Sequence, residues 1–347
     1  MNSTMNLWVE SILQSPQKLA MPIMTHPGID LVGKKVIDAV TDGNVQFEAV
    51  KAVQDNYPTA AATMMMDLTV EAEAFGSTIK FAGNEIPVVA KCLVSDLKTI
   101  QELQVPLLNR ARVPQYLKAA RLAVGRIADK PVFGGCIGPF SLAGRLFDLS
   151  EMMTALYTEP DSIKLLLEKS AAFLLAYARE MKTLGADGII MAEPAAGLLS
   201  PAMCDEFSSQ YIQPIVSQVQ DEHFLFILHN CGNKGQVTRS MLATGAGGLP
   251  FGNVVNLSET LKEMTADILA LGNLDPVGVF KMARPEEVFE ATAKLLLRTA
   301  DRKNFLASSG CDLPPQVPPQ NVEAFFAAVG AFNAQKPEEH LAMEYAP

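Results

Sequence analysis

The chain has 347 residues, 49% of them hydrophobic and 19% charged, a balance that supports a large buried core and excludes intrinsic disorder. Its formal net charge is -10 and no basic stripe is available to neutralise phosphates, so we expect no nucleic-acid partner. The sequence opens without a basic stretch before an apolar core, and no apolar run approaches the roughly 18 residues of a membrane span. We therefore expect a soluble, cytoplasmic protein with no membrane partner.

Short apolar runs alternate with longer helical patterns throughout the chain, which is typical of repeated βα units. Eight of the short runs are predicted strands: Leu19–Thr25, Ala61–Asp67, Val132–Ile137, Gly188–Glu193, Phe224–Cys231, Gly248–Gly252, Ile268–Asn273 and Phe305–Ser309. The predicted helices include Gly43–Asp55, Ser162–Leu184, Pro201–Gln220, Gly235–Thr244 and Pro285–Arg298, together with one ahead of the first strand. This pattern predicts an α/β fold, a TIM-type (β/α)8 barrel formed by residues 1–347 as a single domain.

Residues 71–121 do not fit this alternation and are predicted to be an insertion between the second and third barrel strands. The insertion contains a strand-like piece, Ile79–Val89, and a helix. The proline-rich stretch Pro314–Pro319 is predicted to be a loop over the barrel mouth.

Three residues at predicted strand ends have side chains that bind metals. His229 and Cys231 are two positions apart at the end of one strand, and the two-residue period of a strand places both side chains on the same side. Cys311 follows the eighth strand, and all strands of a barrel bring their carboxyl ends to one face. The five cysteines are too few, and odd in number, for a secreted disulfide framework, so we expect reduced thiols.

One imidazole and two thiolates form a donor set that suits Zn²⁺, and three protein ligands leave a position for a substrate. The same residues also fit a second interpretation, in which Cys231 and Cys311 are small buried hydrophobic residues and His229 is a hydrogen-bonded polar residue at a strand end. Spacing alone leaves these two interpretations equally open, because a single H-x-C motif is weak.

Two acidic residues end predicted strands on the same face and are candidate catalytic residues. Asp67 could polarise a substrate group, or it could cap the helix that starts near Val70. Glu193 could be a displaceable fourth zinc ligand or a substrate contact, or it could have a structural role. For Asn273 and Asp275 a turn is the simpler interpretation, with a hydrogen bond from that turn to His229 as the alternative.

Several segments resemble the uroporphyrinogen decarboxylase superfamily, in the same order along the chain. They are MMMDLTVEAEAFG (64–76), GCIGPFSLAGRL (135–146), GADGIIMAEPAAGLLSP (185–201), LHNCGN (228–233), LGNLDPV (271–277) and SSGCDLPPQVPPQN (308–321). Within this superfamily, H-x-C followed by a distant cysteine resembles the zinc motif of the corrinoid-dependent methyltransferases, such as the methylcobamide:coenzyme M methyltransferases. All three ligand positions match: His229, Cys231 and Cys311.

This resemblance implies a zinc-dependent methyltransferase that moves a methyl group from a methylated corrinoid to a small thiol, which the zinc activates as a thiolate. The chain contains no D-x-H-x-x-G cobalamin-binding motif, so we expect a partner protein to supply the methylated corrinoid. The resemblance also gives Asp67 the position of the decarboxylase's substrate-binding aspartate.

Two alternatives remain. One is a metal-free lyase of the decarboxylase type that acts on a carboxylated substrate, with Asp67 stabilising a cationic intermediate. The decarboxylases hold their substrate through arginines near the N-terminus, whereas the first arginine here is Arg110 and the early loop offers Lys34 and Lys35. The other alternative is a noncatalytic, corrinoid-associated binding protein that keeps the fold.

Overall fold

A parallel β-sheet lies at the centre of the computed structural model, which describes residues 4–335. Within these residues the sheet has seven strands in the order β1-β4-β5-β6-β7-β8-β9, and every neighbouring pair is parallel. Their bounds are β1 (Ala62–Thr63), β4 (Val132–Ile137), β5 (Gly188–Ala192), β6 (Leu225–His229), β7 (Gly248–Pro250), β8 (Leu269–Leu274) and β9 (Phe305–Ser309). The alternation of these strands with helices makes the fold α/β.

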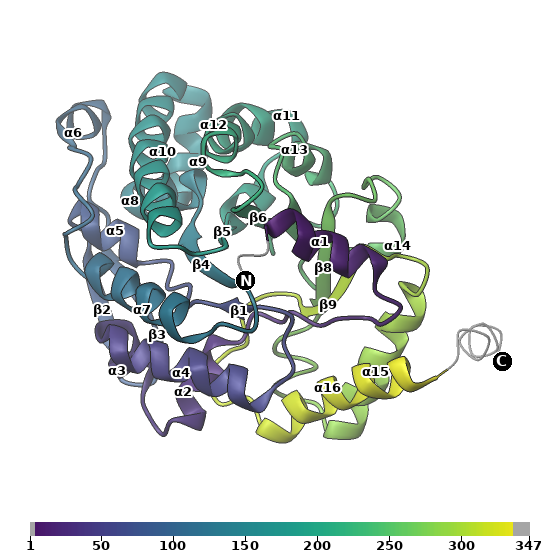
Figure 1. The fold of residues 1–347 in the computed structure, drawn as a ribbon. Coiled ribbons are helices and arrows are strands. Elements are labelled where there is room, and N and C mark those ends of the chain that lie inside the picture. The colour runs from purple at the N-terminus through teal and green to yellow at the C-terminus, as the bar shows by residue number, and fades with distance from the viewer. Residues whose placement is uncertain (1–3, 336–347) are drawn as a thin grey trace.

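Helices surround the curled sheet on its outer side (Figure 1). They are α1 (Met5–Gln14), α2 (Thr25–Leu31), α3 (Val36–Thr41), α4 (Gly43–Asn56), α5 (Val70–Phe75), α6 (Leu97–Glu102), α7 (Val113–Arg126), α8 (Pro139–Phe147), α9 (Leu149–Thr158), α10 (Pro160–Thr183), α11 (Pro201–Cys204), α12 (Gln210–Val219), α13 (Thr238–Leu242), α14 (Leu257–Thr260), α15 (Pro285–Arg298) and α16 (Pro319–Ala334). Among the described residues, none of these helices has the length and apolar character needed to span a membrane.

The expected first strand, Leu19–Thr25, is wrong as a strand. Ala20 forms a single parallel bridge with Ala307 of β9, and its carbonyl accepts a 2.8 Å hydrogen bond from the Ala60 amide just before β1. On the β1 side the pairing stops because Pro22 has no amide hydrogen. On the β9 side the next amide, that of Ile23, donates to the Ser309 hydroxyl instead of a backbone carbonyl, and the chain enters α2 at Thr25. An extended segment therefore lies between β9 and the start of β1. Within residues 4–335, the sheet has seven strands instead of the eight of the expected barrel.

Residues 71–121, the expected insertion, include most of α5, all of α6 and part of α7 rather than the one predicted helix. The strand-like piece of the insertion, Ile79–Val89, is an antiparallel hairpin of β2 (Thr78–Ala82) and β3 (Glu85–Lys91), separate from the main sheet. Gly83 lies between them with φ +47, a backbone conformation that glycine adopts without steric cost, so the chain reverses here.

Two predicted helices also differ from the observed ones. The segment expected as Pro201–Gln220 is α11 and α12 joined by a π-helical turn, Asp205–Ser209. The segment expected as Gly235–Thr244 begins only at Thr238. The side chain of Asn233 accepts hydrogen bonds from the amides of Gly235 and Val237, and this local turn competes with helix formation.

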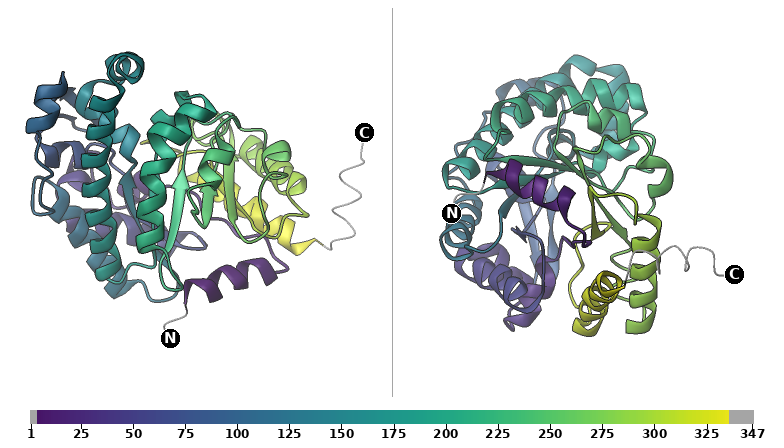
Figure 2. Two further views of the ribbon diagram at one scale, coloured as in Figure 1. Left: turned by 90° about the horizontal axis from the view of Figure 1, so that it is seen from above. Right: turned by 45° about the vertical axis from the view of Figure 1, so that its right-hand side comes forward.

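Both faces of the sheet are buried, as expected for parallel strands covered by helices. Alternate strand residues form a cluster inside the curl, and the other residues pack beneath the outer helices; the inner cluster includes Phe133, Ile190, Ile227, Leu271 and Leu306. Helix α1 lies across the end of the sheet where the strands begin (Figure 2). The ring of Trp8 in this helix is 5.7 Å from the ring of Phe133. The carboxyl ends of the strands lie at the opposite end of the sheet, where a functional site can form.

Candidate metal centre

Strand β6 fixes His229 at the carboxyl end of the sheet. His229 is paired with Ala192 of β5 in the parallel ladder, and its carbonyl accepts a 2.8 Å hydrogen bond from the Glu193 amide. The side chain is 1% exposed. Asn230 then bridges to Phe251 after β7, so the chain is still held by the sheet when it reaches Cys231.

The structure brings together the three residues that the sequence proposed as ligands. One ligand atom from each of His229, Cys231 and Cys311 lies within 4.8 Å of the other two. Cys311 comes from the loop after β9, and both cysteines are half-buried. The remaining cysteines, Cys92, Cys136 and Cys204, are not part of this group in the described chain.

The two sulfur atoms share one proton. A hydrogen bond from the Cys231 thiol lowers the pKa of Cys311 to about 4, although burial opposes this shift. The same hydrogen bond, together with burial, raises the pKa of Cys231. Burial alone would lower the pKa of His229, but the neighbouring Cys311 sulfur, the Pro250 carbonyl and Asp312 together raise it. The cluster therefore carries a thiolate at neutral pH, the form in which cysteine binds metals.

The imidazole of His229 is oriented as a metal-binding ring would be. Its Nδ1 donates to the carbonyl oxygen of Pro250 at 3.1 Å, which leaves the lone pair on Nε2. The Nε2 atom is buried and has no hydrogen-bonding partner among residues 4–335. A buried acceptor without a partner costs free energy, and a cation at this point would remove that cost. One imidazole nitrogen and two sulfurs therefore fit Zn²⁺.

Two glycines allow the neighbouring loops to approach the cysteines closely. A Cβ on Gly252, after β7, would lie 2.6 Å from the Cys231 carbonyl oxygen, and one on Gly310 would lie 2.5 Å from the Asn253 nitrogen. Only glycine leaves room for such backbone contacts. The loops after β6, β7 and β9 therefore pack on one another around the cluster.

Asp67 is held in a buried ion pair. Its Oδ2 contacts Arg112 Nη1 and accepts a 3.2 Å hydrogen bond from Tyr116, while its Oδ1 accepts from the amide and hydroxyl of Thr69 at 3.0 and 2.7 Å. Arg112 also binds Glu73 at 2.6 Å. Both carboxylate oxygens are thus occupied. Asp67 is not the N-cap of α5, which is Thr69, and its bonds to Thr69 form a turn just before the helix begins.

The pairing of Arg112 with Asp67 was not predicted from the sequence. Arg112 lies 45 positions after Asp67 in the chain, just before α7, and no periodic pattern connects the two residues.

Glu193 binds the beginning of α8. Its two carboxylate oxygens accept hydrogen bonds from the amides of Phe140 and Ser141 at 3.0 and 2.6 Å, and the residue is 1% exposed. Burial raises the pKa of Glu193 to about 7, while the Ser141 and Phe140 hydrogen bonds oppose the shift. Within the described residues, Glu193 is not a member of the group formed by His229, Cys231 and Cys311.

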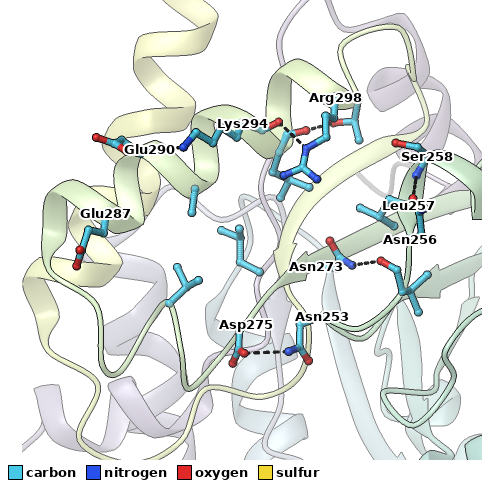
Figure 3. A pocket seen from close by; sticks show the side chains of 16 residues that line it. Asn253, Asn256, Leu257, Ser258, Asn273, Asp275, Glu287, Glu290, Lys294 and Arg298 are labelled. Atoms are coloured by element: carbon cyan, nitrogen blue, oxygen red, sulfur yellow. Dashed lines mark hydrogen bonds and ion pairs between the residues drawn. The ribbon is translucent and has the colours of Figure 1, made fainter.

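The expected turn after β8 lines a cavity of about 720 Å³ beside α15 (Figure 3). Asp275 accepts hydrogen bonds from the amides of Val277 and Gly278 and from the Asn253 side chain, as a turn residue does. Asn273 lies within β8, paired with Ser308 of β9, rather than in the expected turn. Its side chain donates to the carbonyls of Gly252 and Val255 at 3.0 and 2.9 Å. The Nδ1 partner of His229 is the Pro250 carbonyl rather than this turn.

Comparison with known proteins gives several matches. Residues 16–332 match the family model described as uroporphyrinogen decarboxylase (URO-D). The methylcobamide:CoM methyltransferase MtbA of Methanosarcina acetivorans is 31% identical over 76% of this chain and 77% of its own length. A uroporphyrinogen decarboxylase of Pseudomonas savastanoi pv. phaseolicola is 28% identical over 84% of this chain and 85% of its own. A solved methyltransferase from Methanosarcina mazei has the same fold, with a TM-score of 0.85, 23% identity, and coverage of 95% of this chain and 99% of that one.

Proposed function

Since the chain belongs to the uroporphyrinogen decarboxylase (URO-D) family, whose members include methyltransferases, we propose that it transfers a methyl group from a methylated corrinoid to a small thiol. In this proposal His229, Cys231 and Cys311 hold one Zn²⁺ ion, and a partner protein supplies the corrinoid. The whole chain acts as one catalytic domain.

The single observation that carries the proposal is the convergence of one imidazole and two sulfurs within 4.8 Å of one another. These residues come from the ends of β6 and β9, which are not neighbours in the sheet. A buried imidazole nitrogen without a partner, facing a thiolate, is a poor arrangement for a structural core and a good one for a metal.

His229, Cys231 and Cys311 would hold the zinc ion, which would supply a Lewis acid that lowers the pKa of a bound thiol and keeps its sulfur nucleophilic at neutral pH. The chain's own residues contribute charge and position. The two cysteines offset the charge of the cation, which leaves the substrate sulfur electron-rich. Pro250, through its carbonyl, holds the His229 ring in a fixed orientation, and this pre-organises the site.

The bonds of Asp67 favour methyl transfer over the decarboxylase type of reaction. A carboxylate that stabilises a cationic intermediate must be free to face it, whereas both oxygens of Asp67 are bound by Arg112, Tyr116 and Thr69. The cations in the loop after the first segment are Lys34 and Lys35, both exposed, and lysine lacks the bidentate fork with which arginine holds carboxylates.

Metal analysis tests the proposed site. Wild-type protein purified without chelator is expected to contain about one zinc ion per chain, and Cys311→Ser is expected to lose most of it. Cys204→Ser is the matched control, because this cysteine is buried outside the group. Zinc retained at the wild-type level in Cys311→Ser would refute the assigned ligand set.

A separate measurement tests the reaction. Zinc-loaded protein is mixed with methylcobalamin and a thiol such as coenzyme M or homocysteine, and the change in the cobalamin spectrum is followed. The methyl group forms a bond to sulfur, the electron pair of the cobalt–carbon bond stays on cobalt as Co(I), and the thiol proton goes to solvent. Demethylation that depends on both thiol and zinc is expected, and none with any thiol would exclude the proposed reaction.

A further inference from the structure

The loop that carries Cys311 leaves the sheet at the end of β9. The last bond that continues the ladder runs from the Gly310 amide to the Leu274 carbonyl of β8 at 2.6 Å, and Cys311 follows it, before Pro314 and Pro315. A third ligand on a free loop would pay the entropy of ordering that loop when a metal binds. The hydrogen bonds of the residues around Cys311 therefore show what orders this loop.

The residues on both sides of Cys311 are bound to one short segment near the N-terminus. Before it, the Ser309 hydroxyl accepts a 3.1 Å hydrogen bond from the Ile23 amide. After it, the Leu313 amide donates to the Ile23 carbonyl at 3.0 Å. Ile23 is 2% exposed, so these bonds form in a dry environment where they are difficult to break.

Two residues that follow Met24 in the segment, Thr25 and His26, hold the loop with side chains. Thr25 donates its amide to Asp312 Oδ1 at 3.2 Å and its hydroxyl to Asp312 Oδ2 at 2.8 Å. His26 Nδ1 lies 2.8 Å from the Leu313 carbonyl and 3.3 Å from Asp312 Oδ2. Thr25 and His26 are 2% and 6% exposed. Asp312 is therefore gripped through both of its oxygens, directly next to Cys311.

We infer that Thr25 and His26 are positioning residues, which hold Asp312 and Leu313 so that the Cys311 sulfur is presented to the metal centre. This inference rests on the proposed function, because it concerns the same site. Partners that orient a metal ligand typically change metal affinity by roughly 10- to 100-fold when they are removed. His26 enters the site through this contact rather than as a ligand.

Zinc affinity, measured by competition with a chelator, tests the inference. Thr25→Val removes the hydroxyl at nearly constant volume and is expected to weaken zinc binding roughly 10- to 100-fold. Thr25→Ser restores the hydroxyl and is expected to restore the affinity. His26→Leu is expected to weaken binding in the same way, whereas His26→Asn keeps a side-chain N–H and is expected to have a smaller effect.

Thr292→Val is the matched control. Thr292 is 0% exposed and its hydroxyl donates a 2.7 Å hydrogen bond within α15, outside the metal cluster. This variant loses the same kind of bond and is expected to keep wild-type zinc affinity. An equal loss of affinity in Thr25→Val and Thr292→Val would assign the effect to general destabilisation and overturn the inference, as would unchanged affinity in Thr25→Val.

A second measurement works without metal. In chelator-treated protein, the rate at which iodoacetamide alkylates Cys311 is followed by peptide mass spectrometry, with Cys92 as the internal reference. Thr25→Val is expected to speed alkylation of Cys311 severalfold relative to Cys92, because the loop is no longer held. An unchanged ratio overturns the inference even if the wild type contains zinc. If the wild-type protein contains no zinc, the proposed function is refuted instead. The alkylation ratio still shows whether Thr25 holds the loop of Cys311.

Discussion

His229 and Pro250 are joined by a 3.1 Å hydrogen bond from the imidazole Nδ1 to the proline carbonyl, across neighbouring strands β6 and β7. A proline cannot donate through its own nitrogen, but its carbonyl remains free to accept. The bond sets which nitrogen of the ring carries the proton, and it directs the other nitrogen toward the two sulfurs. The sheet itself thus selects the tautomer of the candidate ligand.

Replacement of His229 by glutamine is expected to reduce the zinc content to a small fraction of one ion per chain, because the amide cannot supply the buried imidazole lone pair. Metal analysis of the purified variant measures this. His223→Gln is the control, since the His223 side chain is 59% exposed and lies outside the site. Wild-type zinc content in His229→Gln would show that the ring is not a ligand.

Arg112→Leu is expected to lower the free energy of unfolding by roughly 3–5 kcal/mol, because it leaves the Asp67 charge buried without its partner. Urea denaturation measures the change. Adding Asp67→Asn to this variant removes the uncompensated charge and should recover much of the loss. Arg239→Leu breaks an ion pair whose arginine is 85% exposed, and at most about 1 kcal/mol is expected there. Similar losses from both arginines would contradict the buried network.

Glu71 predicts a pH dependence of stability. Burial raises its pKa from 4.5 to about 7, the Ile137 amide opposes this shift, and Asp67 and Arg145 act in opposite directions on it. Between pH 4.5 and 7 the folded chain keeps a proton that the unfolded chain releases, so the free energy of unfolding falls as the pH rises. At roughly 1.4 kcal/mol per pKa unit, the loss is roughly 3 kcal/mol.

Glu71→Gln keeps a neutral group of the same shape and should flatten this pH profile, measured by urea denaturation across the same window. Part of the slope should remain in the variant, because burial also raises the pKa of Glu193 to about 7. A profile parallel to that of the wild type would mean that Glu71 ionises normally in the folded chain.

Gly252→Ala is expected to weaken zinc binding, because the added Cβ would lie 2.6 Å from the Cys231 carbonyl oxygen and 3.0 Å from its Cα, and the cysteine must move. Chelator competition measures the affinity. Gly125→Ala is the control, since no atom lies within 4 Å of the added carbon in α7. That change should stabilise the chain by roughly 0.5–1 kcal/mol and leave zinc affinity unchanged. Equal affinities in the two variants would contradict the tight contact at Cys231.

The meeting of the candidate ligands could be anticipated in part, because the shared carboxyl end of parallel strands brings Cys311 to the end of the sheet where His229 lies. The strand period of two was the wrong reason for Cys231, because β6 ends at His229 and Cys231 lies in the turn that follows. The strands Val132–Ile137 and Phe305–Ser309 were predicted with the bounds that the structure gives them.

The parts that could not be anticipated depend on single contacts between distant segments. The pairing of Arg112 with Asp67 and the grip of Thr25 on Asp312 have no periodic signal, because side-chain hydrogen bonds follow from the assembled fold. The failed strand at Leu19–Thr25 has a local cause in Pro22. Its apolar composition predicted an extended segment but gave no information about how many ladder bonds would form.

The contact between residues 23–26 and the loop of Cys311 also has a consequence for biosynthesis. His26 and Leu313 are 287 positions apart in the chain, so during translation the complete donor set can assemble only after the ribosome has made both segments. A nascent chain that has reached β6 offers two donors without the third. Tight retention of the metal would thus require synthesis beyond β9, and shorter products of translation would leave the ion exchangeable.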